Sequence, residues 1–193
     1  MPSHLTRRTA RACASGAAIL ALVAATVSAQ PDGETLTAQA RVSTKGGVRA
    51  SAPVTVVIRR FASDTDRDAL KAALAQGGTS AARALLAKRD DLGTIQVGAR
   101  RTPIKFAYRQ TTAAGHLVTI VTAEPIVFLG AGLPHAPTTK GFDLGFANLE
   151  VATAGPGVGE LLPATKIRFN ADGALTTDGY SDTVIELTNV TGK

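Results

Sequence analysis

Cysteine is almost missing from this chain. The single cysteine, Cys13, precedes an apolar run that has the features of a removable leader, so residues 30–193 contain none. An exported domain can use disulfide bonds for stability, but this one has no thiols to form them. Its 164 residues must therefore bury a hydrophobic core, and that length is sufficient for a single domain.

Tryptophan is absent, and aromatic residues make up only 4% of the chain. Proteins that bind single-stranded nucleic acids stack bases on aromatic side chains, and few are present here. Three of the 21 basic residues lie in the leader, so residues 30–193 hold 18 basic and 15 acidic residues, a net charge of +3. This small excess is not the footprint of a nucleic-acid-binding domain, and we expect no nucleic-acid partner.

Motifs for catalysis, metal binding and nucleotide binding are also missing. Residues 30–193 contain two isolated histidines, His116 and His135, whereas a zinc site needs about four clustered ligands. The acidic pattern at 64–68 lacks the glycine and glutamate of a calcium loop and is typical of a helix start. The glycine-rich segment 155–159 is not followed by a helix, as a phosphate-binding loop would be. We predict no catalytic, cofactor-binding or metal-ligating residue and no cofactor.

The first 29 residues are typical of a secretion signal. Three arginines, Arg7, Arg8 and Arg11, lie in its first part and give it a positive charge. An apolar run follows at 17–27, and small residues lead to a predicted cleavage between Ala29 and Gln30. The run is shorter than the roughly 20 apolar residues of a membrane span, so after cleavage we expect a periplasmic or secreted protein with no span. An uncleaved anchor and twin-arginine export remain alternatives.

Residues 30–193 read as one domain composed mainly of strands. Apolar and polar residues alternate along 36–43, 102–110 and 183–190, and 53–61 is rich in β-branched residues. Strands are also expected at 94–97, 116–122 and 166–170, with a bulge near Ala147 and a loop at 155–159. The predicted class is α+β and mainly antiparallel, with about eight strands in a sandwich or a partly closed barrel.

One helical hairpin interrupts the strands near residues 64–92. Capping residues at 63–66 precede Leu70 and Leu74, which recur at helical spacing, and Gly77-Gly78 divides this helix from a second one. The insertion predicts a short helical layer beside the sheet.

A spaced pattern of short segments runs through the part of the chain after residue 92. It consists of Tyr180 and these segments: VTAEPI at 121–126, KGFDL at 140–144, LEV at 149–151, GPGVG at 155–159, PATKI at 163–167 and IELTNV at 185–190. In this pattern the chain resembles a group of small exported bacterial proteins of uncharacterised activity. This resemblance implies a shared fold and export, and it transfers no functional residue.

A basic stripe is the single candidate contact site. Arg101, Lys105 and Arg109 have the same parity on a predicted strand, opposite Phe106 and Tyr108. Such a stripe of about 26 Å could contact an anionic envelope polymer or an acidic protein surface. The alternative is an ordinary solvated sheet face whose long side chains discourage aggregation.

These observations favour a non-enzymatic envelope or secreted module that acts by binding a partner. One rival is a hydrolase-type enzyme whose acidic residues meet in a cleft, which would show carboxylates with shifted pKa values in a deep pocket. Another is a small-ligand carrier, which would show an apolar cavity inside a barrel.

Overall fold

The computed structural model describes residues 33–43, 49–128, 141–177 and 184–193. They form nine strands of one antiparallel sheet, a separate two-stranded sheet and one kinked helical element. The elements of the large sheet are β1 (Glu34–Ser43), β2 (Arg49–Ile58), β3 (Gly93–Val97), β4 (Arg100–Ile104), β5 (Phe106–Thr112), β6 (Gly115–Val121), β7 (Leu144–Ala152), β8 (Gly157–Thr165) and β11 (Ile185–Gly192). The predicted α+β class with a partly closed barrel is confirmed.

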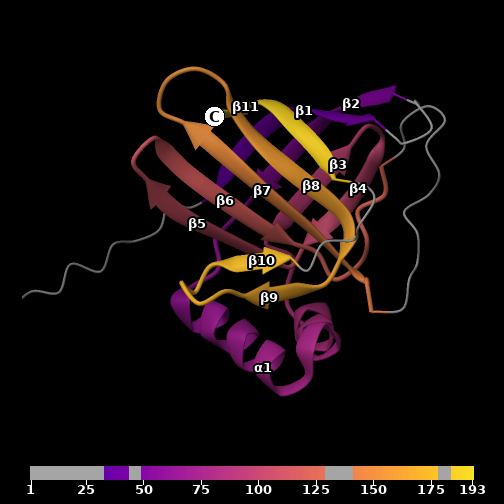
Figure 1. Ribbon diagram of the computed structural model, residues 1–193, viewed down its shortest axis with the longest axis vertical. Coiled ribbons are helices and arrows are strands. Elements are labelled where there is room, and N and C mark those ends of the chain that lie inside the picture. The colour runs from indigo at the N-terminus through magenta and orange to yellow at the C-terminus, as the bar shows by residue number, and fades with distance from the viewer. Residues whose placement is uncertain (1–32, 44–48, 129–140, 178–183) are drawn as a thin grey trace, which may run out of the picture.

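The sheet curls because its two edge strands are joined by one residue. The strand order is β4-β3-β2-β1-β11-β8-β7-β6-β5, so β4 and β5 occupy opposite edges. Only Lys105 separates the end of β4 from the start of β5, and its backbone N–H donates to the Val121 carbonyl at 3.0 Å. The edges therefore meet at this corner, and Figure 1 shows the resulting barrel.

Alternating apolar side chains fill the space inside the barrel. Adjacent strands contribute residues that face one another in register, such as Val56 with Leu36 on one side and Ile95 on the other. All three side chains are fully or almost fully buried. Burial with a period of two residues is what a strand with one covered face requires.

The outer face of β5–β8 is covered as well. The element α1 (Asp64–Ala87) packs on a hairpin of β9 (Ile167–Phe169) and β10 (Leu175–Thr177). Figure 1 shows this layer below and in front of the barrel. Phe106 and Phe146 are buried on the outer side of the sheet, while their neighbours Ala107 and Ala147 are buried on the inner side.

The predicted helical hairpin is confirmed. Ser63 caps α1 because its hydroxyl accepts from the Asp66 N–H at 3.2 Å, and the Asp66 carboxylate accepts from the Ser63 N–H at 3.0 Å. Gly77 and Gly78 leave the helical conformation, and Gly78 has a φ of 61°, which glycine adopts without strain. The two halves of α1 consequently run in different directions (Figure 1).

Several local predictions were wrong. The strand expected at 102–110 is broken at Lys105. The break in the alternation of β7 lies at Gly145, between Leu144 and Phe146, and not near Ala147.

Of the glycine-rich segment expected to be a loop, Gly155 and Pro156 lie outside any strand, but residues 157–159 begin β8. A Cβ atom at Gly159 would lie 2.3 Å from the Asn148 carbonyl oxygen of β7. Glycine is therefore needed here because two backbones approach closely. In the sequence, glycines that serve this purpose look the same as the glycines of a loop.

We expect Gly159→Ala to lower the free energy of unfolding by about 3 kcal/mol, because the added methyl group must push β8 away from β7. Gly155→Ala is the control: a Cβ there meets no atom within 4 Å, but φ is +78°. It should cost about 1 kcal/mol from backbone strain alone. Urea denaturation of both variants measures the difference, and equal costs would contradict the close-approach argument.

Candidate functional site

A groove of about 470 Å³ lies between α1 and β9. Its floor is apolar, and its rim carries three cations. The floor residues are Leu74, Ala75, Ile167 and Phe169, and the cations are Lys71, Lys166 and Arg168. The volume falls within the range of small-molecule sites in proteins.

Contacts from both halves of α1 fix the walls of the groove. Beyond the Gly77–Gly78 bend, the hydroxyl of Thr79 accepts from the backbone N–H of Ile167 at 3.3 Å. In the first half, the guanidinium of Arg67 lies 5.8 Å from the centre of the Phe169 ring and 5.3 Å from that of Tyr108. The first contact joins β9 to the second half of α1, and Arg67 joins β9 and β5 to the first half. These contacts hold the two walls of the groove together.

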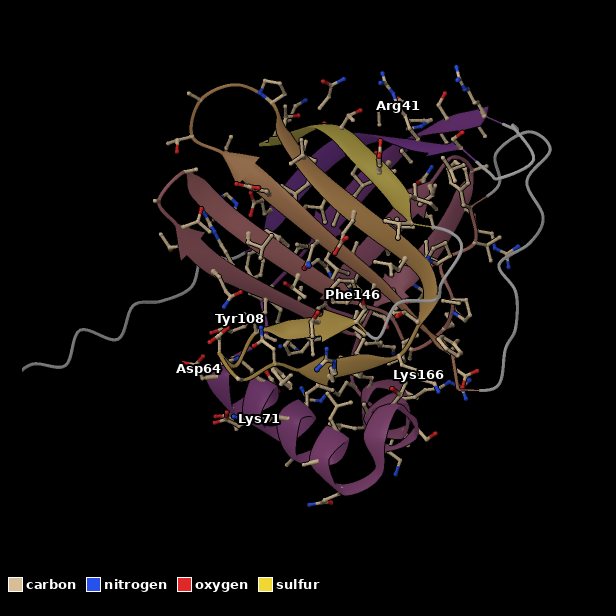
Figure 2. All side chains as sticks on the ribbon, viewed as in Figure 1. Arg41, Asp64, Lys71, Tyr108, Phe146 and Lys166 are labelled. Atoms are coloured by element: carbon tan, nitrogen blue, oxygen red, sulfur yellow. The ribbon has the colours of Figure 1, made fainter. Side chains whose placement is uncertain are left out.

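Lys71 and Lys166 come from opposite walls, as Figure 2 shows. The Lys71 side chain is exposed on α1. The Lys166 Nζ lies 4.7 Å from the centre of the Phe142 ring, a cation–π contact that positions the ammonium group. None of the described residues that line the groove is acidic, and this balance of charge favours the binding of anions.

The predicted basic stripe is not a single surface. Arg101 lies on the outer face of edge strand β4, where its Nε donates to Gln96 Oε1 at 2.7 Å. Arg109 lies on the opposite edge strand and shares the inner face with Ala107. Lys105 lies in the link between the two strands. The prediction assumed one continuous strand, and the break at Lys105 places these cations in three different environments.

Lys105 lines a second cleft of about 300 Å³ that contains a network of ion pairs. Its Nζ lies 2.7 Å from Asp91 Oδ1 and 2.8 Å from the Arg89 carbonyl oxygen. Arg89 in turn pairs with Asp66 at 2.6 Å. The cations at the centre of this cleft are thus already matched by carboxylates.

Arg109 belongs to a polar chain across the inside of the barrel. His116 Nε2 lies 2.9 Å from Glu34 Oε1, and Arg109 Nη2 lies 3.4 Å from His116 Nδ1. The side chains of His116 and Glu34 are 15% and 10% exposed. Because Arg109 only donates, His116 Nδ1 accepts and Nε2 donates to Glu34. Both ring nitrogens are then occupied, so the chain links β1 to β6 and leaves no free base.

The acidic residues at the start of α1 have structural partners. Asp64 accepts from the Tyr108 hydroxyl at 3.1 Å, and burial together with this hydrogen bond raises the pKa of Tyr108. Burial opposes ionisation of Asp66, but hydrogen bonds from Ser63 and the charge of Arg89 outweigh it, so the pKa of Asp66 lies below 3.8. In the described segments, no three side chains gather as a metal-binding set.

Sequence reasoning missed the groove because its two walls lie far apart in the chain, at 71–79 and 166–169. The one signal for the groove in the sequence is the basic residue on either side of Ile167. These residues lie in the segment 166–170, which the sequence predicts as a strand.

Comparison with known proteins gives no relative. No protein-family profile, curated protein or solved structure matches the chain. Among the described residues, no helix has the length and apolar character that a membrane span requires.

We expect Asp66→Asn to lower the free energy of unfolding by about 1 kcal/mol at neutral pH, the usual value of a helix cap. Because the folded pKa is lowered, the charged Asp66 contributes stability above pH 3.8, and this contribution is lost as the pH falls below that value. The difference between wild type and variant should therefore shrink at about pH 3. Urea unfolding at both pH values tests this, with the exposed Asp68→Asn as a control that changes little.

Proposed function

We propose that this protein is an exported, non-enzymatic binding module whose α1–β9 groove receives an anionic partner. The observation that carries the proposal is the groove itself, whose described lining residues combine three cations with an apolar floor and include no carboxylate. The basic stripe in the sequence suggested an anionic partner. The proposal retains a partner of that charge but places the contact in the α1–β9 groove instead of on the stripe.

The rival functions have less support in the described part of the chain. A hydrolase-type site needs carboxylates with shifted pKa values in a pocket, and the shifted carboxyl of Asp66 already accepts from the Ser63 N–H in the capping box of α1 and pairs with Arg89. A carrier needs an apolar cavity, and the barrel interior is occupied by packed side chains such as Leu36, Ile95 and Val118. Binding at the surface is the function that the geometry favours.

Export is proposed from the sequence of the leader alone, since residues 1–32 lie outside the described part. We expect the protein recovered from the periplasm or the medium of its own cells to begin at Gln30. Intact-mass spectrometry measures this end directly. A full-length chain retained in the cell would contradict export.

We expect the purified protein to bind polyglutamate, with an affinity that falls as salt rises because exposed charges are screened. Lys71→Gln together with Lys166→Gln should weaken binding up to about thirtyfold, since two exposed ion pairs each contribute up to about 1 kcal/mol. Isothermal titration calorimetry at two salt concentrations measures the effect.

The matched control is Arg100→Gln together with Arg101→Gln, which removes the same charge from β4. It should leave polyglutamate binding close to that of the wild type. Loss of binding in the control pair but not in the groove pair would place the anionic contact on β4 and overturn the proposal.

A further inference from the structure

We infer that the ligand of the α1–β9 groove is an amphiphile with one anionic head group and a hydrocarbon chain. This inference rests on the proposed function and names the chemistry of its ligand. A carboxylate, phosphate or sulfate head would satisfy the charge at the rim. The chain would cover the apolar floor.

The floor of the groove calls for apolar contact as well as charge. Leu74 and Phe169 are only partly buried against the core, and Ala75 is exposed. A fully polar anion would leave this apolar surface in water. Each methylene group that is buried there strengthens binding about fourfold, so a hydrocarbon chain adds affinity that a simple anion cannot obtain.

The cations are placed for a head group at the rim. Figure 2 shows Lys71 on α1 and Lys166 next to the start of β9. The Lys166 ammonium group lies over the Phe142 ring. Lysine side chains lay their methylene stems along apolar surface while the ammonium group stays in water. This arrangement matches an amphiphile, whose charged and apolar parts are separated in the same way.

The hydrogen bonding of β9 disfavours an extended peptide as the occupant. One edge of β9 pairs with β10, from Ile167 opposite Thr177 to Phe169 opposite Leu175. On the edge that faces α1, the Ile167 N–H already donates to the Thr79 hydroxyl. A peptide strand that added to this hairpin would need those backbone groups to be free. A hydrocarbon chain needs none of them.

The test is displacement of a dansyl-labelled undecanoate from the purified protein, which has no tryptophan to interfere with the fluorescence. The competitors, used below their micelle concentrations, are dodecanoate, dodecanol, phosphate and a short acidic peptide. We expect dodecanoate to displace the probe at a concentration at least about tenfold lower than dodecanol, because it adds the ionic contact. Phosphate and the peptide should displace it poorly.

One double variant and two matched single variants test whether the effect depends on the groove. The double variant Lys71→Gln/Lys166→Gln should weaken dodecanoate binding about tenfold and leave dodecanol unchanged. Ala75→Phe fills the floor and should weaken both. Ala72→Phe adds the same ring at an exposed position of α1 that does not line the groove, and should weaken neither.

The outcomes separate this inference from the proposed function. If polyglutamate binding depends on Lys71 and Lys166 but dodecanoate binding does not, the amphiphile is wrong and the anion-binding module stands. Stronger displacement by the acidic peptide than by dodecanoate would also contradict an amphiphilic ligand and would leave the anion-binding module in place. If neither ligand responds to these lysines, both proposals are overturned.

Discussion

The one-residue link at Lys105 is the constraint on which the architecture depends. It joins the last residue of β4, Ile104, to the first residue of β5, Phe106, although these strands form opposite edges of the sheet. A flat sheet of nine strands cannot satisfy such a link, so the sheet curls until its edges meet. The interior then becomes a packed core. Away from the corner, the N–H of Ala62 donates to the Ala107 carbonyl and covers part of the β5 edge.

The curvature also explains why a second layer exists. Neighbouring side chains on a strand face opposite sides of the sheet. On β5 and β7, the large side chains of Phe106 and Phe146 face outwards, and the small side chains of Ala107 and Ala147 face inwards. That outer apolar surface has to be covered, and β9, β10 and α1 cover it. The groove is a consequence of this layer, since it forms where the helix passes over the small hairpin.

The sequence predicted those elements whose signals are local. Ser63 and the Gly77–Gly78 pair located the helical hairpin, alternation located β1 and most of β11, and β-branched residues located most of β2. Prediction failed where a signal had two physical causes. The alternation of Phe106 and Tyr108 reflects burial under a second layer, not burial inside the barrel. The glycines of β8 allow a close backbone approach and were read as a loop. The groove joins distant segments, and no alternation within one strand could reveal it.

The place of the last strand has a consequence for the order of assembly. β11 ends at Gly192, yet it lies in the sheet between β1 and β8, with Ala40 opposite Leu187 and Leu161 opposite Ile185. The N-terminal and C-terminal parts of the barrel are therefore joined by a strand that is synthesised after both of them. Until β11 is available, β1 and β8 each lack a neighbour, and the sheet cannot be completed. Pairing across nearly the whole chain also makes folding intrinsically slow, which lengthens the time during which the chain stays open.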